Sequence, residues 1–179
     1  LYLYTYRRKL LDSLRHVLFF TILMAMLICA AFLVLRHFSA SYIFLIPFAW
    51  VPIITRVFYD SRTAIFIHII TVFIVSIAAP APYVFILLQV ITGIVAVISL
   101  RDMTQRAQLA QTALFTFLMY SIVYTASTLL VTGSIANVEY NYYIYFAVNA
   151  VLVICAYGLI FLFERTFGLV SNITLVELT

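Results

Sequence analysis

The stretch Val17–Leu35, VLFFTILMAMLICAAFLVL, contains no charged residue and a single hydroxyl group. A helix rises 1.5 Å per residue, so about 20 apolar residues are needed to cross the hydrocarbon layer of a bilayer. The length and composition of this stretch therefore predict a membrane-spanning helix.

The rest of the chain repeats this pattern. Overall 66% of the residues are hydrophobic and only 9% are charged, against roughly 25% charged in soluble domains. The sequence predicts an all-α, polytopic integral membrane helix bundle within residues 1–163, with a connector to a downstream domain over 164–179. Six complete spans are expected, at 17–35, 42–59, 63–79, 82–100, 112–132 and 142–163.

The basic residues predict the orientation of the bundle. If the chain enters the first span from inside, every Lys and Arg except Arg36 falls on the cytoplasmic side, as the positive-inside rule requires. The formal net charge of +4 is then a topology signal and not a sign of nucleic-acid binding. We expect a multi-pass protein with a cytoplasmic C-terminus.

The first residues, LYLYTYRRK, place Tyr2, Tyr4 and Tyr6 directly before a basic cluster. Interfacial tyrosines next to basic residues are typical of the inner end of a span. We interpret them as the end of a seventh helix, with a short interfacial segment as the alternative.

Candidate chemistry is sparse in this sequence. The three histidines are scattered, and the two cysteines, Cys29 and Cys155, fall in different spans as small buried hydrophobic residues. No metal-ligand spacing, G-x-S-x-G motif or phosphate-binding glycine loop is present. We therefore expect no catalytic residue, metal site or cofactor in this chain.

Four polar residues within or beside spans are candidates for intramembrane contacts: Gln89, Asn149, His68 and Arg56. Polar groups are costly in lipid, and they either pack against neighbouring helices or serve function. We expect interhelical hydrogen bonds for the first three, and an interfacial Arg56 paired with Asp60. Pro47 and Pro52 are each expected to bend the second span.

The tail, FERTFGLVSNITLVELT, is amphipathic. Glu164 and Arg165 mark the exit from the membrane, and Leu169, Ile173 and Val176 then recur on one helix face. A helix this short needs a covering surface to be stable, which predicts a connector.

This tail resembles the segment before the catalytic domain in bacterial seven-transmembrane HD phosphohydrolases. The stretches YDSRTAIF and LRDMTQRAQLA are also similar to inner loops of that family. The residues that match the tail pattern E-x-x-F-G-x-x-(S/T)-x-x-x-L-x-E-L are Glu164, Phe167, Gly168, Ser171, Leu175, Glu177 and Leu178.

The resemblance implies an extracytoplasmic domain before the bundle and, after it, a cytoplasmic HD phosphodiesterase that uses divalent metal ions and acts on cyclic di-AMP. The bundle would anchor, dimerise and relay a signal in the bacterial inner membrane. Its partners would be the lipid bilayer, the protein's own two domains and a second copy, with a small sensed ligand left open.

One alternative belongs to a different class. The substrate-binding membrane components of vitamin transporters also have six spans in a chain of similar size. In that interpretation residues 140–145, Gln89 and Asn149 would line an outward-facing pocket.

Overall fold

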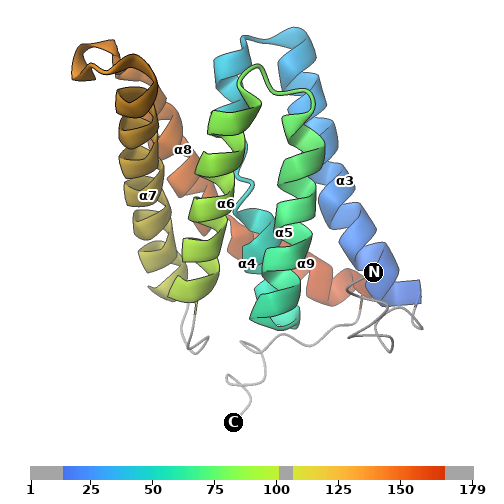
Figure 1. The fold of residues 1–179 in the computed structure, drawn as a ribbon. Helices are drawn as coiled ribbons and strands as arrows, with labels where there is room; N and C mark the ends of the chain where they lie inside the picture. Colours follow the sequence, from blue (N-terminus) through green and yellow to red (C-terminus); the bar gives the residue numbers. More distant parts are fainter. Residues whose placement is uncertain (1–13, 101–106, 168–179) are drawn as a thin grey trace.

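The computed structural model describes residues 14–100 and 107–167, and all regular structure within these ranges is helical. The predicted all-α class is confirmed. The elements, shown in Figure 1, are α3 (Leu14–His37), the 3-10 helix η1 (Ala40–Leu45), α4 (Trp50–Phe58), α5 (Ser61–Ser76), α6 (Pro82–Ser99), α7 (Ala107–Thr132), the 3-10 helix η2 (Ile135–Asn137), α8 (Asn141–Ile154) and α9 (Ala156–Phe167).

Five stretches of the described chain are long and apolar enough to cross a membrane, by length and composition. They comprise α3, η1 with α4, α6, α7, and α8 with α9. The sixth, α5, is apolar but has only 16 residues. The chain is thus a multi-pass membrane protein.

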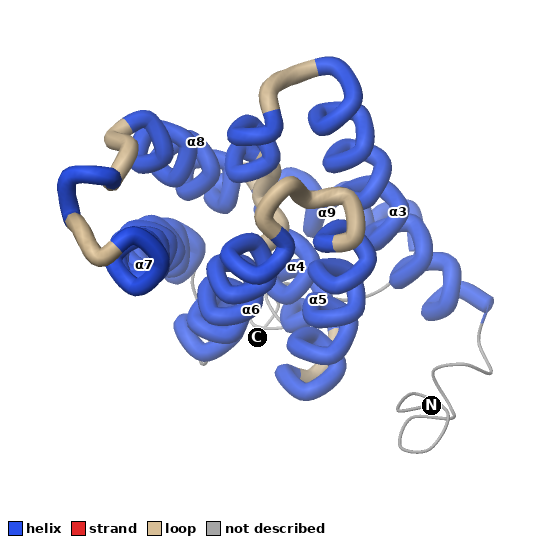
Figure 2. The backbone as a smooth tube through the Cα atoms, turned by 45° about the horizontal axis from the view of Figure 1, so that its top comes forward, coloured by secondary structure: helices blue, strands red, loops and turns tan. Residues whose placement is uncertain are grey.

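The helices run alternately up and down, so that consecutive connections lie at opposite ends (Figure 1). The α3–η1, α5–α6 and α7–α8 connections share one end, which faces forward in Figure 2. The last turn of α3 holds Arg36, whereas Arg56 and Arg165 lie in the last turns of α4 and α9 at the opposite end. We call the first end the outer end and the second the inner end, following the predicted orientation.

The second predicted span, 42–59, is interrupted in the structure. The 3-10 helix η1 ends at Leu45 and α4 begins only at Trp50. Pro47 explains the break because it has no N–H to continue the helix. Pro52 does not interrupt α4, because it lies in the first turn of that helix, where an N–H needs no helical partner.

The last predicted span, 142–163, is also interrupted. Helix α8 ends at Ile154, and α9 begins at Ala156 after the single residue Cys155. In Figure 1 the two helices cross behind α6 and α5, and α9 ends beside the start of α3. The end of the chain's last span therefore lies next to the beginning of its first described span.

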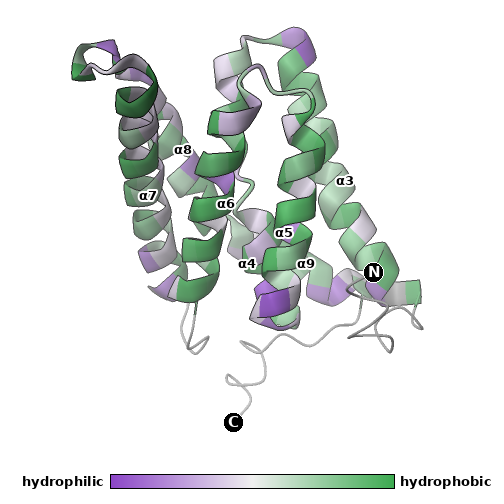
Figure 3. Ribbon diagram, in the orientation of Figure 1, coloured by the Kyte–Doolittle hydropathy of each residue, from purple (hydrophilic) through white to green (hydrophobic). Residues whose placement is uncertain are grey.

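The outward faces of the helices are strongly apolar, as Figure 3 shows by the predominance of hydrophobic residues along their length. Leu118 and Ile122 on α7 and Phe161 on α9 are exposed, which suits contact with lipid. Cys29 and Cys155 are exposed too, so the prediction that they are buried is wrong. Because a free cysteine behaves as a small hydrophobic residue, exposing its thiol to apolar lipid costs little free energy.

Candidate functional site

The first part of the candidate site is the contact between the two interrupted spans. The buried Asn149 of α8 donates from Nδ2 to the carbonyls of Phe44 and Ile46, both at 2.9 Å. In an unbroken helix the Phe44 carbonyl would accept from Phe48, but that N–H bonds to Ile46 instead. Asn149 therefore satisfies carbonyl groups that the break removes from the helical pattern.

A second bond runs in the opposite direction. Trp50, the first residue of α4, donates its indole N–H to the Leu152 carbonyl at 2.8 Å. Leu152 lies in the last turn of α8, just before the interruption at Cys155. Each broken span thus supplies a side chain that bonds to the backbone of the other near its break. We call this pair of contacts the interlock.

The second part of the site is a buried polar core. His68 of α5 bonds through Nε2 to the Gln89 carbonyl of α6 at 2.9 Å. Tyr120 of α7 donates its hydroxyl to Gln89 Oε1 at 2.6 Å. Gln89 therefore joins α5 and α7 to α6 through two hydrogen bonds.

Gly93 makes room for this arrangement. A methyl group at Gly93 would collide with the His68 imidazole ring, so only a glycine at that position lets the histidine lie against α6. Because Gly93 has no side chain, the imidazole ring of His68 can be buried between α5 and α6.

The polar core keeps unused hydrogen-bonding capacity. Among the described residues, no partner is found for His68 Nδ1, Gln89 Nε2 or Asn149 Oδ1, nor for the hydroxyls of Thr55 and Thr92. Unpaired polar atoms are few in native interiors. In this bundle the unpaired atoms belong to side chains of several different spans. This capacity distinguishes the polar core from the apolar packing around it.

The third part of the site is an aromatic cluster at the inner end. Phe19 of α3 is fully buried and lies with its ring centroid 5.2 Å from that of Phe163 and 5.8 Å from that of Phe167, both on α9. Phe58 and Tyr59, at the end of α4, contact the same ring at 5.4 and 5.5 Å. The cluster joins the inner ends of three spans.

The predicted connector begins inside this cluster. Phe167 stacks on Phe163 at 5.7 Å, and Glu164 is half-buried on the same helix. The remaining predicted connector residues, Gly168, Ser171, Leu175, Glu177 and Leu178, lie outside the described residues.

Arg56 lies in the last turn of α4 and lines a space of about 330 Å³ with Ser61 and Val97. Its Nε atom is buried without a hydrogen-bond partner in the described chain. Its pairing with Asp60 stays a prediction; the Asp60 carboxylate accepts a bond from the Thr63 hydroxyl at 2.8 Å.

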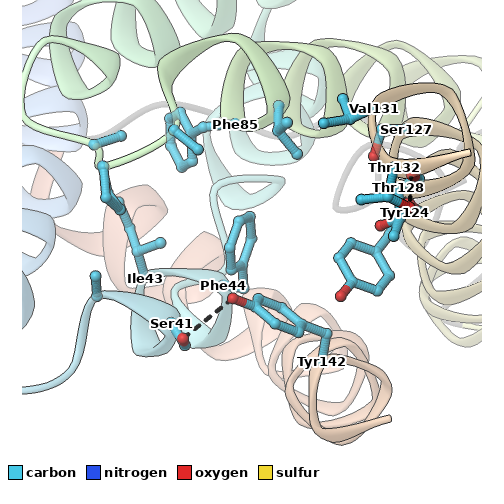
Figure 4. Close-up of a pocket in the computed structure, with 15 residues that line it drawn as sticks. Ser41, Ile43, Phe44, Phe85, Tyr124, Ser127, Thr128, Val131, Thr132 and Tyr142 are labelled. Atoms are coloured by element: carbon cyan, nitrogen blue, oxygen red, sulfur yellow. Dashed lines mark hydrogen bonds between the residues drawn. The ribbon is translucent and has the colours of Figure 1, made fainter. Parts of the chain in front are cut away.

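The fourth part is a cavity of about 220 Å³ at the outer end. Its walls come from η1, the α5–α6 turn, α6, α7 and α8 (Figure 4). Ile43, Phe44 and Phe85 form one side, hydroxyl-bearing residues of α7 form the other, and Tyr142 lies below.

The cavity differs from the pocket expected for a transporter component. Tyr142 lines it, but Gln89 and Asn149 do not. Their side chains are engaged with Tyr120 and with the carbonyls at the break.

Sequence reasoning identified Gln89, Asn149 and His68, but it missed Trp50, Gly93 and Phe19. The chain has only one tryptophan and four glycines, so the rarity of both types was an available signal for the first two. Phe19 is one of 16 phenylalanines, and nothing in its local sequence marks it.

No group of three or more His, Cys, Asp or Glu side chains that could hold a metal ion is found within residues 14–100 and 107–167. The described geometry is that of a polytopic helical bundle with an outer cavity and a polar core. Its last described helix, α9, packs against α3 through the aromatic cluster.

Comparison with family models agrees with this class. Residues 1–171 match the family described as 7TM receptor with intracellular HD hydrolase. The chain belongs to this family, and it comprises the membrane receptor region. No match was found among curated proteins or among solved structures.

Proposed function

We propose that this bundle senses a signal in the bacterial inner membrane and sets the activity of a cytoplasmic HD phosphodiesterase that hydrolyses cyclic di-AMP. Divalent metal ions would belong to that domain. The connector, residues 164–179, would carry the conformational change, with the full-length protein acting as a homodimer.

The observation that carries this proposal is the aromatic cluster. Helix α9 extends beyond Phe163 to Phe167, and both rings contact Phe19 of α3. Phe167, which belongs to the predicted connector, therefore packs against α3. A shift of α3 or α4 relative to α9 would move the start of the connector, as in known helix-shift switches.

The interlock supports the same proposal, because its contacts begin beside the outer cavity. The outer-end residue Phe44 lines the cavity, and its carbonyl accepts from Asn149 of α8. Trp50 then joins α4 to α8 at Leu152, four residues before α9 begins at Ala156. A continuous series of contacts therefore runs from the outer cavity to the inner end.

The test is a helical-phase experiment in membranes that contain the full-length protein. Inserting one alanine after Gly168 rotates a following helix by about 100°, whereas four alanines restore roughly the same face and add about 6 Å. We expect hydrolysis of cyclic di-AMP to change severalfold with one inserted residue and to recover partly with four.

A matched control separates coupling from stability. Phe167→Ala should alter activity like the single insertion, whereas Phe161→Ala, on an exposed position of the same helix, should not. If both insertions and Phe167→Ala leave hydrolysis unchanged, the connector is a passive tether and the proposal is wrong. Crosslinking of the full-length protein in membranes tests the homodimer.

A further inference from the structure

The outer cavity has the chemistry of a ligand site for a neutral molecule. None of its lining residues is charged. Placing an unpaired charge in such a space is costly, and the lining residues themselves offer no counter-charge; Glu139, which interacts electrostatically with Tyr124, is not among them. The lining therefore selects against charged ligands.

Four aromatic side chains line the cavity: Phe44, Phe85, Tyr124 and Tyr142. The Tyr142 ring lies 4.8 Å from Tyr124 in a stacked arrangement and 5.5 Å from Phe44 in an edge-to-face one, measured between centroids. Phe85 adds a fourth ring, 6.3 Å from Phe44. Offset stacking and edge contacts are the geometries that aromatic partners prefer, so a planar ring fits this wall.

Two tyrosine hydroxyls lie beside the cavity, and that of Tyr142 is the better placed to bond a polar group on the ligand. Tyr142 Oη lies 3.2 Å from Ser41 Oγ, and Tyr124 Oη accepts from the Glu139 N–H at 3.4 Å. Both contacts are long compared with the usual 2.7–3.0 Å. The Tyr142 hydroxyl can therefore form a shorter bond to a ligand without losing a strong internal bond, whereas the Tyr124 hydroxyl is also hydrogen-bonded to the Thr128 side chain.

The size and position of the cavity suit a small molecule that arrives from outside the bundle. A cavity of roughly 150 Å³ in another protein admits benzene, so about 220 Å³ accommodates a somewhat larger ring system. Ala81, Val131 and Thr132 line the cavity and are exposed, and they form its opening at the outer end.

We propose that this cavity binds a small, neutral, planar aromatic molecule with one hydrogen-bonding group, held between Phe44, Phe85, Tyr124 and Tyr142. This inference concerns binding alone and does not depend on the proposed control of a phosphodiesterase.

The experiment measures binding of 5-fluoroindole and 4-fluorophenol to the full-length protein in lipid nanodiscs by fluorine NMR, with empty nanodiscs as the baseline. We expect saturable binding of at least one probe. Fluorinated tryptamine and fluorinated indole-3-acetate, which carry opposite charges, should bind at least tenfold more weakly than 5-fluoroindole.

Two pairs of variants locate the site. Val84→Trp fills the cavity and should weaken binding at least tenfold, whereas Tyr83→Trp, the exposed neighbour on α6, should not. Tyr142→Phe should weaken binding severalfold, whereas Tyr145→Phe, on the same helix but outside the cavity, should have no effect.

Absence of saturable binding of both probes above the baseline would overturn the proposal. Equal binding of the charged analogues would contradict it as well. If Val84→Trp fails to fold, the comparison of Tyr142→Phe with Tyr145→Phe decides, and equal affinities for these two would place the site elsewhere.

Discussion

Single side chains in this bundle compensate for backbone groups that lipid cannot satisfy. An unpaired carbonyl in the hydrocarbon region has no water to bond, and Asn149 supplies donors to two carbonyls at the break in the second span. Gly93 contributes by having no side chain, because His68 occupies the space that a methyl group would fill.

Replacing Asn149 by leucine should lower the free energy of unfolding by about 1–3 kcal/mol, because it removes one donor each from the part-buried Phe44 carbonyl and the buried Ile46 carbonyl. Reversible unfolding in mixed micelles measures the change. Asn141→Leu, at the exposed start of α8, is the control and should have little effect; equal losses for the two variants would argue against the assigned role.

Gly93→Ala should destabilise the bundle by about 1–3 kcal/mol, the usual cost of overpacking. Gly158→Ala is the matched control, since nothing lies near a methyl group there, and in a helix it should be neutral or stabilising by up to about 1 kcal/mol. If the collision with His68 is the cause, the double variant with His68→Ala recovers part of the stability lost in Gly93→Ala.

At the scale of elements, the two interrupted spans hold each other. Interrupted helices are tolerated inside a membrane where the freed backbone groups are buried in protein and bonded. Here the bonds run in both directions, through Asn149 of α8 and Trp50 of α4. The two breaks are therefore one structural unit.

The element-scale prediction is a double-mutant cycle. Trp50→Phe should cost about 0.5–1.5 kcal/mol through the loss of one hydrogen bond. Combined with Asn149→Leu, the cost should differ from the sum of the single variants by about 0.5 kcal/mol or more, as for other residues in one network. Strict additivity would mean that the two contacts act independently.

At the scale of the whole molecule, the distribution of basic residues agrees with the arrangement of the helix ends. Arg56 and Arg165 lie at the end opposite Arg36. This is the asymmetry on which the predicted orientation rests.

Reporter fusions test that orientation. Fusions after Arg106 and after Thr179 should both report a cytoplasmic location, and a fusion within residues 135–141 should report the outside. A Thr179 fusion that reports the outside would reverse the bundle and remove the basis for coupling to a cytoplasmic enzyme.

The sequence predicted the helical membrane class because hydrophobic length depends on composition alone. It also indicated Gln89, Asn149 and His68, because polar residues are conspicuous in apolar runs. It could not predict the interlock, since Asn149 and Phe44 are 105 residues apart and only the folded arrangement brings them together. The break at Cys155 could not be predicted either, because no proline lies near it in the sequence.

The interlock has a consequence for how the chain is made. Of the five candidate spans, Ala40–Phe58 is the least apolar, and its break is bonded by a residue synthesised about a hundred positions later. During translation this segment emerges long before Asn149 exists. Until α8 follows, its carbonyls must be shielded by the insertion machinery, by a chaperone or by interfacial water. We therefore expect biogenesis of this bundle to include a late closing step, and a nascent chain arrested before α8 is the form that quality control should recognise.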